Sequence, residues 1–511
     1  MRAFYYLFYF ALLAACATNQ SREEPTSTLA AFYDLELKPF YHGVASGDPL
    51  QDAVVIWTRV TPDQEMERLE VEWEFSTDQD FENIIQSGTF TTGPSRDYTV
   101  KVDVSNLAAG NNYFYRFKSL EAYSAIGRTK TAPAASDLIN FAVVSCSNYE
   151  FGYFNAYGHI ARQEDLDAVI HLGDYIYEYG TGSYGDSATG RFNLPPYEIV
   201  SLEDYRTRYS LYRLDPDLQS VHNNHPMIAI WDDHEIANNS YETGAQNHQE
   251  DEGPYEERRS AAVQAYYEWL PIRENSEHYR KFDYGDLVDL IMLDERLEGR
   301  SRPLDSLSDP ALMDSSRSML GQEQLVWLKE QLLESEAQWK VIGNQVIFSY
   351  LNWGYEPNFT INLDSWDGYP IEQREIADFI KEIDNVIFIT GDTHSSWAFE
   401  VTVDPFETYD PESAAGAVAV EFGTTSINSA NSNERVGTDT VLMHEKRIVN
   451  SPINPHLKYA NLRDHGYLLL SLTPSRATAS WHYVPTLMER VPEASIGKQL
   501  YVNAGEVKLR E

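Results

Sequence analysis

The residues best suited to chemistry follow an apolar run in the first half of the chain. Residues 168–172 are followed directly by Gly173 and Asp174, and Tyr177 lies a few positions further on. Gly173 lets the backbone turn without a side-chain clash, so that Asp174 can leave the end of a buried strand and Tyr177 can reach back towards it. The carboxyl end of a strand is where α/β sheets bind ligands, so we expect a carboxylate and a phenol in one site.

Other potential ligands follow further apolar runs. The segment 231–239 reads Trp-Asp-Asp-His-Glu-Ile-Ala-Asn-Asn. Asp392 and His394 stand two residues apart, so both side chains can point the same way on an extended backbone. Six apolar segments end in Cys, Asp or Asn, namely 141–146, 168–174, 227–233, 288–294, 340–344 and 386–392. A shared site at the strand ends explains this repetition better than coincidence does.

This mixture of donors indicates which metals the site could hold. Carboxylate and amide oxygens suit Ca²⁺ or Mg²⁺, whereas an anionic phenolate and a thiolate such as that of Cys146 suit a trivalent iron. A dedicated Zn²⁺ site would usually show more His and Cys. Two metals bridged by one carboxylate form the template for displacement at phosphorus, so the donors predict a dinuclear hydrolytic centre.

The order of the elements indicates a fold with a small β domain before a larger α/β domain. Short alternating segments broken by turn residues come first and favour antiparallel strands in a β-sandwich. Apolar strands separated by longer, partly helical segments, such as 260–270 and 322–336, come afterwards. We therefore predict a β-sandwich domain over residues 37–132 and a catalytic domain over residues 137–511.

Composition limits the partners. The 511 residues exceed one ordinary domain, which agrees with this division. The 39 Lys and Arg residues against 79 Asp and Glu residues leave a formal net charge of -40, which repels polyanions and excludes a bulk nucleic-acid footprint. We interpret the acidity as a solvated surface and expect a monomer.

The N-terminus predicts export. Arg2 precedes an apolar run over residues 3–15 that is too short to span a membrane as a mature helix and fits a signal peptide over residues 1–15. The run ends in Leu-Ala-Ala-Cys16, which resembles the lipobox of bacterial lipoproteins, so we expect Cys16 to be lipidated and residues 16–36 to tether the protein to a membrane. Soluble secretion is the alternative. With Cys16 modified, Cys146 is left as a single thiol and no disulfide framework is available.

Taken together, the motifs resemble a known family. It is the PhoD-like alkaline phosphatase/phosphodiesterase family of the calcineurin-like metallophosphoesterases. The resemblance covers nearly the whole mature chain and rests on Cys146 and on segments 42–49, 56–60, 173–178, 231–235, 238–239, 293–296 and 391–397.

The resemblance implies a fold and a metal centre. The fold class is α+β/α/β, a four-layer metallophosphoesterase sandwich of two mixed sheets flanked by helices. The centre would contain Fe³⁺ with one or two Ca²⁺, and Zn²⁺ or Mg²⁺ are conceivable substitutes. When the ligand roles of the family are transferred to the matching positions of this sequence, Cys146, Tyr177 and His394 would hold iron, and Asp174 would bridge the metals.

The remaining roles are transferred from the family in the same way. Asp392 and Asn238 would hold calcium, with Asp233 as the alternative ligand to Asn238. His234 would donate a proton or orient the phosphate, and Asp174 takes part in catalysis as the bridge. Arg296 would contact the phosphate or, alternatively, form a salt bridge to a neighbouring acid.

The predicted activity is hydrolysis of phosphate monoesters or diesters by a metal-activated hydroxide at an exported, membrane-anchored lipoprotein. Phosphate esters of small molecules, including nucleotides or lipid headgroups, are the expected substrates. One alternative is a phospholipase D-like diesterase, to whose substrates a membrane tether would give access. Another is a surface lipoprotein that binds calcium and has no enzymatic activity.

Overall fold

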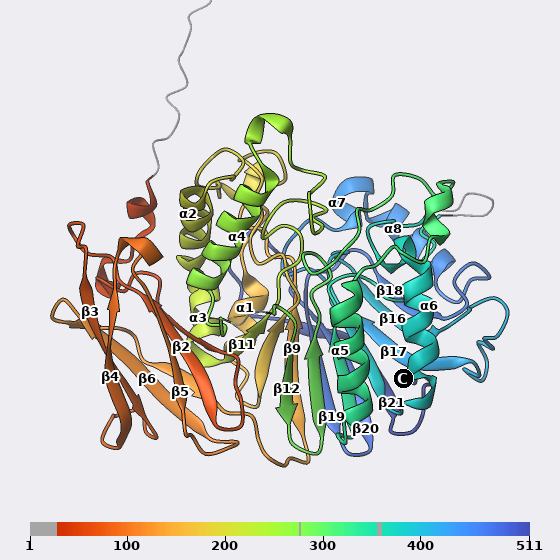
Figure 1. The fold of residues 1–511 in the computed structure, drawn as a ribbon, viewed down its shortest axis with the longest axis horizontal. Coiled ribbons are helices and arrows are strands. Elements are labelled where there is room, and N and C mark those ends of the chain that lie inside the picture. Colours follow the sequence, from red (N-terminus) through yellow and green to blue (C-terminus); the bar gives the residue numbers. More distant parts are fainter. Residues whose placement is uncertain (1–27, 275–276, 355–359) are drawn as a thin grey trace, which may run out of the picture.

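The computed structural model describes residues 28–274, 277–354 and 360–511 (Figure 1). The predicted signal peptide and Cys16 lie outside the described residues. Residues 28–36, the described end of the predicted tether, include the short 3-10 helix Leu29–Phe32 and the start of a second, Leu35–Leu37. The Tyr33 ring stacks on Tyr41 with centroids 4.1 Å apart. Among the described residues, no helix has both the length and the apolar character needed to cross a membrane.

The larger sheet has nine strands in the order β21-β20-β19-β9-β10-β11-β1-β2-β5. Strands β9, β10, β11 and β1 run parallel, and the outer pairs are antiparallel, so the sheet is mixed. Its strands are β1 (Val44–Gly47), β2 (Ala53–Arg59), β5 (Thr99–Ser105), β9 (Ile139–Val144), β10 (Ala168–His171), β11 (Pro226–Ala229), β19 (Gly466–Thr473), β20 (Arg476–Tyr483) and β21 (Ser495–Asn503).

The second sheet has seven strands in the order β12-β13-β14-β15-β17-β16-β18. Strands β13, β14, β15 and β17 are parallel and the others antiparallel. Its strands are β12 (Arg280–Tyr284), β13 (Val288–Met292), β14 (Trp339–Gly343), β15 (Val386–Thr390), β16 (Ser396–Thr402), β17 (Ala417–Gly423) and β18 (Leu457–Asn461).

The two sheets pack face to face because the strands are apolar on both faces. Each sheet can therefore bury one face against the other sheet. Val143 and Ile170 of the larger sheet share one buried cluster with Leu290, Val341 and Ile389 of the second sheet. Full burial of such a side chain contributes about 1.5–3 kcal/mol relative to exposure. The predicted pair of mixed sheets is confirmed.

Helices cover the two outer faces of this pair of sheets. One buried cluster joins the larger sheet to α1 (Asn155–Ile160), α2 (Leu202–Arg213), α3 (Pro216–Asn224) and α4 (Tyr255–Trp269). Another joins the second sheet to α5 (Gly321–Glu334) and α6 (Pro370–Phe379), which lie together in Figure 1. The predicted helical segment 322–336 corresponds to α5, whose Leu325, Leu328 and Leu332 are all buried. Two further helices, α7 (Ser432–Val436) and α8 (Thr438–Ile448), follow one another near the strand ends.

The N-terminal β-sandwich shares a sheet with the catalytic domain. Its own sheet contains β3 (Leu69–Ser76), β4 (Ile84–Thr92), β6 (Asn112–Ser119), β7 (Ala122–Tyr123) and β8 (Gly127–Lys130). Val71 and Tyr115 of that sheet pack against Val54 and Ile56 of β2. Strand β2 belongs to the nine-stranded sheet, because β1 pairs with both β2 and β11. An alternating pattern predicts a strand but not its partner, so the sequence does not reveal this shared sheet.

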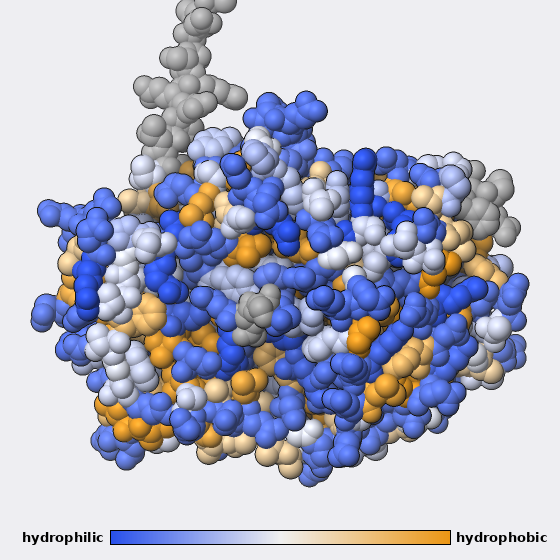
Figure 2. Space-filling view, in the orientation of Figure 1, coloured by the Kyte–Doolittle hydropathy of each residue, from blue (hydrophilic) through white to orange (hydrophobic). Residues whose placement is uncertain are grey.

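The surface agrees with the acidic composition. The face shown in Figure 2 is largely hydrophilic, and its hydrophobic residues form separate patches. A net charge of -40 favours a soluble surface of this kind.

Candidate metal centre

The predicted ligands lie in the loops that follow the strands β9, β10, β11 and β15. Cys146, Asp174, Asp392 and His394 have backbone φ angles of 60°, 55°, 60° and 59°. Non-glycine residues in this left-handed region cost of order 1–3 kcal/mol each, and such strain clusters at functional sites. The loops hold one another in this conformation, because the Cys146 N–H donates to the Gly173 carbonyl at 3.1 Å.

One half of the centre contains the softer donors. Ligand atoms of Cys146, Asp174 and His394 all lie within 4.8 Å of one another, and the three residues are buried. The Tyr177 hydroxyl donates to Asp174 Oδ2 at 3.0 Å and lies 3.2 Å from His394 Nε2. The structure therefore brings together the four residues predicted to surround iron.

The tautomer of His394 suits a metal ligand. Its Nδ1 lies 2.8 Å from the carbonyl oxygen of Ala430, which can only accept, so Nδ1 carries the proton and donates. The lone pair of Nε2 then faces Tyr177. A main-chain carbonyl that fixes the ring in this way is the usual outer contact of a metal-bound histidine. Burial lowers the pKa of His394 to about 3, which keeps the imidazole neutral.

The other half contains carboxylates. Asp232, Asp233 and Asp392 form a second group with ligand atoms within 4.8 Å, and Asp174, Asp233 and His234 form a third. Asp233 belongs to both groups. Asn238 lines the cavity above this cluster, and its Nδ2 donates to Gln246 Oε1 at 2.5 Å. The amide oxygen of Asn238 is therefore left for the site. Asp233 and Asn238, the two alternative calcium ligands, thus both border the centre.

Several acceptors of this cluster are unsatisfied within the described residues. Asp174 Oδ1, Asp232 Oδ2 and Asp233 Oδ1 are buried and have no hydrogen-bond partner. Burial, and then the neighbouring Asp233, raise the pKa of Asp392 to about 7, against the lowering effect of Arg296. Burial and then Asp174 also raise the pKa of the Cys146 thiol. Unpaired buried acceptors and crowded acids are what a cation would satisfy, so the residues present fit a metal pair.

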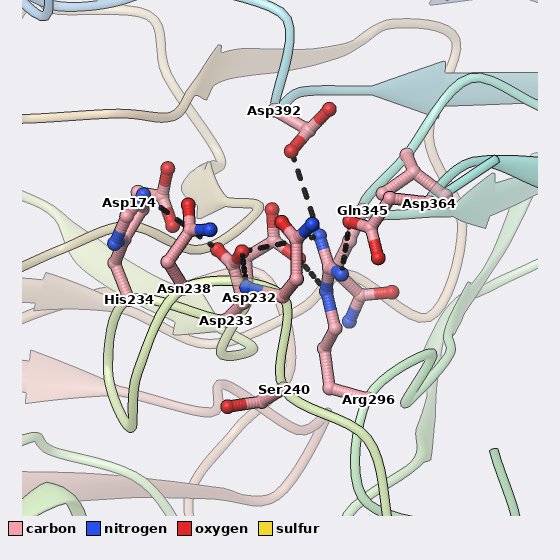
Figure 3. Close-up of polar contacts among 12 residues, drawn as sticks. Asp174, Asp232, Asp233, His234, Asn238, Ser240, Arg296, Gln345, Asp364 and Asp392 are labelled. Carbon is pink, nitrogen blue, oxygen red and sulfur yellow. Dashed lines mark hydrogen bonds and ion pairs between the residues drawn. The ribbon is translucent and has the colours of Figure 1, made fainter. Parts of the chain in front are cut away.

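Arg296 does not contact the cavity. Its guanidinium is fully buried and donates to Asp232, to Asp364 Oδ2 at 2.6 Å and to Asp392 Oδ1 at 3.5 Å (Figure 3). Of the two roles that the sequence left open, the structure shows the salt bridge, and the phosphate contact stays a prediction. The guanidinium donors are turned to acids beneath the centre, which neutralises part of their charge.

The cavity above these ligands has a volume of about 240 Å³. It is lined by Asp174, Tyr179, Tyr184, Asp233, His234, Asn238, Asn239, Asp392, His394 and Arg435. Its size and polar lining suit a phosphoryl group better than a large apolar ligand.

The comparisons with known proteins agree with this geometry. The model of the PhoD-like phosphatase family matches residues 141–481, and that of the PhoD-like phosphatase N-terminal domain matches residues 27–133. The chain belongs to the PhoD-like phosphatase family.

Two relatives extend this result. Alkaline phosphatase D of Bacillus subtilis (strain 168) is 37% identical over 487 residues, which cover 90% of this chain and 79% of the relative. A solved structure described as the structure of PhoD superposes with a TM-score of 0.83 at 34% identity and covers 93% of this chain and 92% of that one. This PhoD-like phosphatase is therefore a phosphoric ester hydrolase.

In this PhoD-like phosphatase, the acids around His234 favour its protonated form. Its Nδ1 donates to Glu178 Oε2 at 2.6 Å, and its ring lies 4.3 Å from the Tyr177 ring. Burial lowers the pKa of His234, but the charges of Asp233, Glu178 and Asp174 outweigh burial and raise the pKa well above its usual value. A protonated imidazole in the cavity wall can donate a proton to a leaving group.

Sequence reasoning missed the cation at the cavity mouth. Among the described residues that line this cavity, Arg435 is the one Lys or Arg, and its Nη2 donates to the Tyr184 hydroxyl at 3.0 Å. It lies on α7, whose sequence carries no motif that points to a site. Glu178 lies inside a recognised motif, but no role was assigned to it.

Two predicted strand ends do not join the centre. Asp294 Oδ1 accepts from the N–H groups of Arg296 and Leu297, both at 2.9 Å. Asn344 Oδ1 accepts from Trp366 Nε1 at 3.0 Å. These two side chains therefore stabilise loops of the second sheet and are not among the grouped metal ligands of the described residues.

Proposed function

We propose that this protein is an exported, metal-dependent phosphatase/phosphodiesterase that hydrolyses phosphate monoesters or diesters. The observation that carries the proposal is the meeting of two unlike donor sets around Asp174 and Asp233. The softer set contains Cys146, Tyr177 and His394, and the harder set contains carboxylates and the Asn238 amide. A softer and a harder set favour Fe³⁺ and Ca²⁺ respectively, with Zn²⁺ or Mg²⁺ as substitutes.

The metals and the protein have separable tasks. When bound, the two cations would supply an activated water and Lewis acidity towards the phosphoryl oxygens. His234, held by Glu178, donates a proton to the departing alcohol. Arg435 lies at the mouth, where its charge attracts the phosphoryl group. Buried Arg296 keeps Asp232 and Asp364 in place beneath the centre.

The sequence supports the setting of this activity. The lipobox at Cys16 supports anchoring to a membrane after export, and the acidic surface supports a monomer that acts on small phosphate esters. Nucleotides and lipid headgroups belong to this substrate class, the latter as in a phospholipase D-like diesterase.

Metal content and turnover test the proposal together. Purified protein should contain two kinds of metal by mass spectrometry and should hydrolyse p-nitrophenyl phosphate or bis(p-nitrophenyl) phosphate. Asp174→Asn should lower kcat/KM by at least about 100-fold and reduce metal content, because this side chain faces both donor sets. The matched control is Asp63→Asn, because the Asp63 side chain is 74% exposed and is neither a grouped metal ligand nor part of the cavity lining. Calcium binding without turnover in the wild-type protein would instead support the non-enzymatic alternative.

A further inference from the structure

A second cavity adjoins the metal centre. It has a volume of about 460 Å³, and Asn239 lines both this cavity and the metal cavity. Gln246 also lines the second cavity, and its Oε1 accepts from Asn238 of the metal cavity at 2.5 Å. The two cavities are therefore separated by side chains of the segment 238–246.

The wall towards the metal centre is held in place by ion pairs. Asp364 lines the second cavity and accepts from Arg296 Nη1 and from Arg300 Nη2, each at 2.6 Å. Arg296 in turn donates to Asp392 of the metal cavity at 3.5 Å. Because this wall is ordered before any ligand arrives, little entropy is lost when a ligand binds against it.

The second cavity lies on the side of the centre away from His234. In Figure 3, His234 and Asp364 stand at opposite ends of the group of side chains, with Asp232 and Asp233 between them. In the proposed function, His234, which lines the metal cavity and is positioned by Glu178, serves the leaving group, so the leaving group lies at the His234 end. The second cavity then faces the other substituent on phosphorus.

The lining of the cavity indicates the chemistry of that substituent. Gln246, Asn362 and Asp305 offer hydrogen-bond donors and acceptors, and Leu304 and Ile361 offer apolar contacts. Arg302 pairs with Asp305 at 3.6 Å, and Asp364 adds a second carboxylate, so the lining does not favour another anion. A volume of about 460 Å³ falls within the usual range for small-molecule sites.

We propose that this cavity binds the non-leaving alcohol of a phosphodiester, and that the preferred alcohol is uncharged, hydroxylated and about the size of a nucleoside. The inference rests on the proposed function and deepens it. It means that the protein distinguishes diesters by the substituent that stays on phosphorus.

Two diesters with one common leaving group test the inference. They are thymidine 5′-(p-nitrophenyl phosphate) and methyl p-nitrophenyl phosphate, whose non-leaving groups differ in size. Leu304→Trp narrows the cavity and should lower kcat/KM for the thymidine ester about tenfold, the usual effect of losing one good pocket contact. It should change kcat/KM for the methyl ester less than about twofold, because a methyl group does not reach the cavity.

Controls separate the outcomes. Leu307→Trp lies in the same loop at a side chain that is 40% exposed and outside the cavity lining, so it should change neither ester. If Leu304→Trp does not fold, Arg302→Ala replaces it, because that side chain is 70% exposed and should tolerate truncation. Arg302→Ala should again lower kcat/KM for the thymidine ester selectively. Equal effects on both esters, or none on the thymidine ester, would overturn the subsite and leave the proposed function intact. If the wild-type protein hydrolyses p-nitrophenyl phosphate but neither diester, the subsite is overturned and the proposed function stands. If it hydrolyses none of the three esters, the proposed function itself is overturned.

Discussion

The two arginines near the centre should behave in opposite ways when each is replaced by methionine. Arg296 is fully buried, and its guanidinium lies 2.6 Å from Asp364, 3.5 Å from Asp392 and 3.9 Å from Asp233. At about 4 Å such a pair is worth roughly 4 kcal/mol before desolvation, at an effective dielectric constant near 20. Desolvation of the charges offsets much of this attraction.

Arg296→Met should therefore act mainly on stability. Removing one partner of a buried ion pair leaves the other charge uncompensated and costs about 3–5 kcal/mol. Asp232 loses its cation and Asp364 keeps only Arg300, so we expect a decrease of about that size in the free energy of unfolding. Arg435 is exposed, and its hydrogen bond to Tyr184 is a surface contact, so Arg435→Met should change stability by less than about 1 kcal/mol.

The loss of activity should show the reverse order, larger for Arg435→Met than for Arg296→Met. Arg435 lines the metal cavity, so its loss should lower kcat/KM for p-nitrophenyl phosphate by about 10- to 100-fold, the value of one to two good charged contacts to phosphate. Urea unfolding followed by the fluorescence of the 10 Trp residues measures the stability of each variant. Steady-state kinetics on protein that is still folded measures the activity.

One combination of results would refute this reasoning. If Arg296→Met unfolds at the urea concentration of the wild type yet loses phosphate affinity, then Arg296 faces the substrate and the buried ion-pair network has no structural role. Arg296→Lys adds a check, because it keeps the charge but loses the forked geometry that reaches several acids at once.

Three further predictions concern protons and the N-terminus. Burial lowers the pKa of His456 to about 4. Between pH 6.5 and pH 4 the unfolded state therefore binds a proton at this residue that the folded state does not bind, and the free energy of unfolding decreases as the pH falls. His456→Gln should make the decline in unfolding free energy shallower by about 1.4 kcal/mol per pH unit in that window, as measured by urea unfolding at several pH values, and an unchanged slope would contradict the assignment. Because Glu178 is among the acids that raise the pKa of His234, Glu178→Gln should move the alkaline limb of the kcat profile to lower pH, whereas a limb at the wild-type position would remove Glu178 from that role. Under the proposed export and lipid anchor, Cys16→Ser should transfer the protein from the membrane to the soluble fraction on cell fractionation, and persistent membrane association would argue against a lipid anchor at this residue.

Much of the fold could be predicted because it depends on local patterns. The apolar segments predicted to be strands correspond to β9, β10, β11, β13, β14 and β15 in the structure, and each is followed by the polar residue that the sequence indicated. A buried strand needs consecutive apolar residues, and a sharp turn needs Gly or a short polar side chain, so both features are legible in the chain itself.

The convergence of the softer donors could also be predicted, because each donor follows a predicted strand. Cys146, Asp174 and His394 come after strands whose carboxyl ends lie at one edge of the sheet pair, and their ligand atoms are within 4.8 Å of one another. The residue types of these loops and their order along the chain were enough to predict that they converge.

What the sequence by itself determined was thus the strands, the turns that end them and the chemical types of the ligands. Tertiary structure alone decided that Arg296 is enclosed by acids, that Arg435 of α7 reaches the cavity mouth, and that β1 pairs with β11. The physical reason is that hydrophobic patterning depends on neighbours along the chain, whereas the direction of a charged side chain depends on which distant groups pack around it. Arg296 and Arg435 carry the same guanidinium, and only the surrounding carboxylates, or their absence, give the two residues different roles.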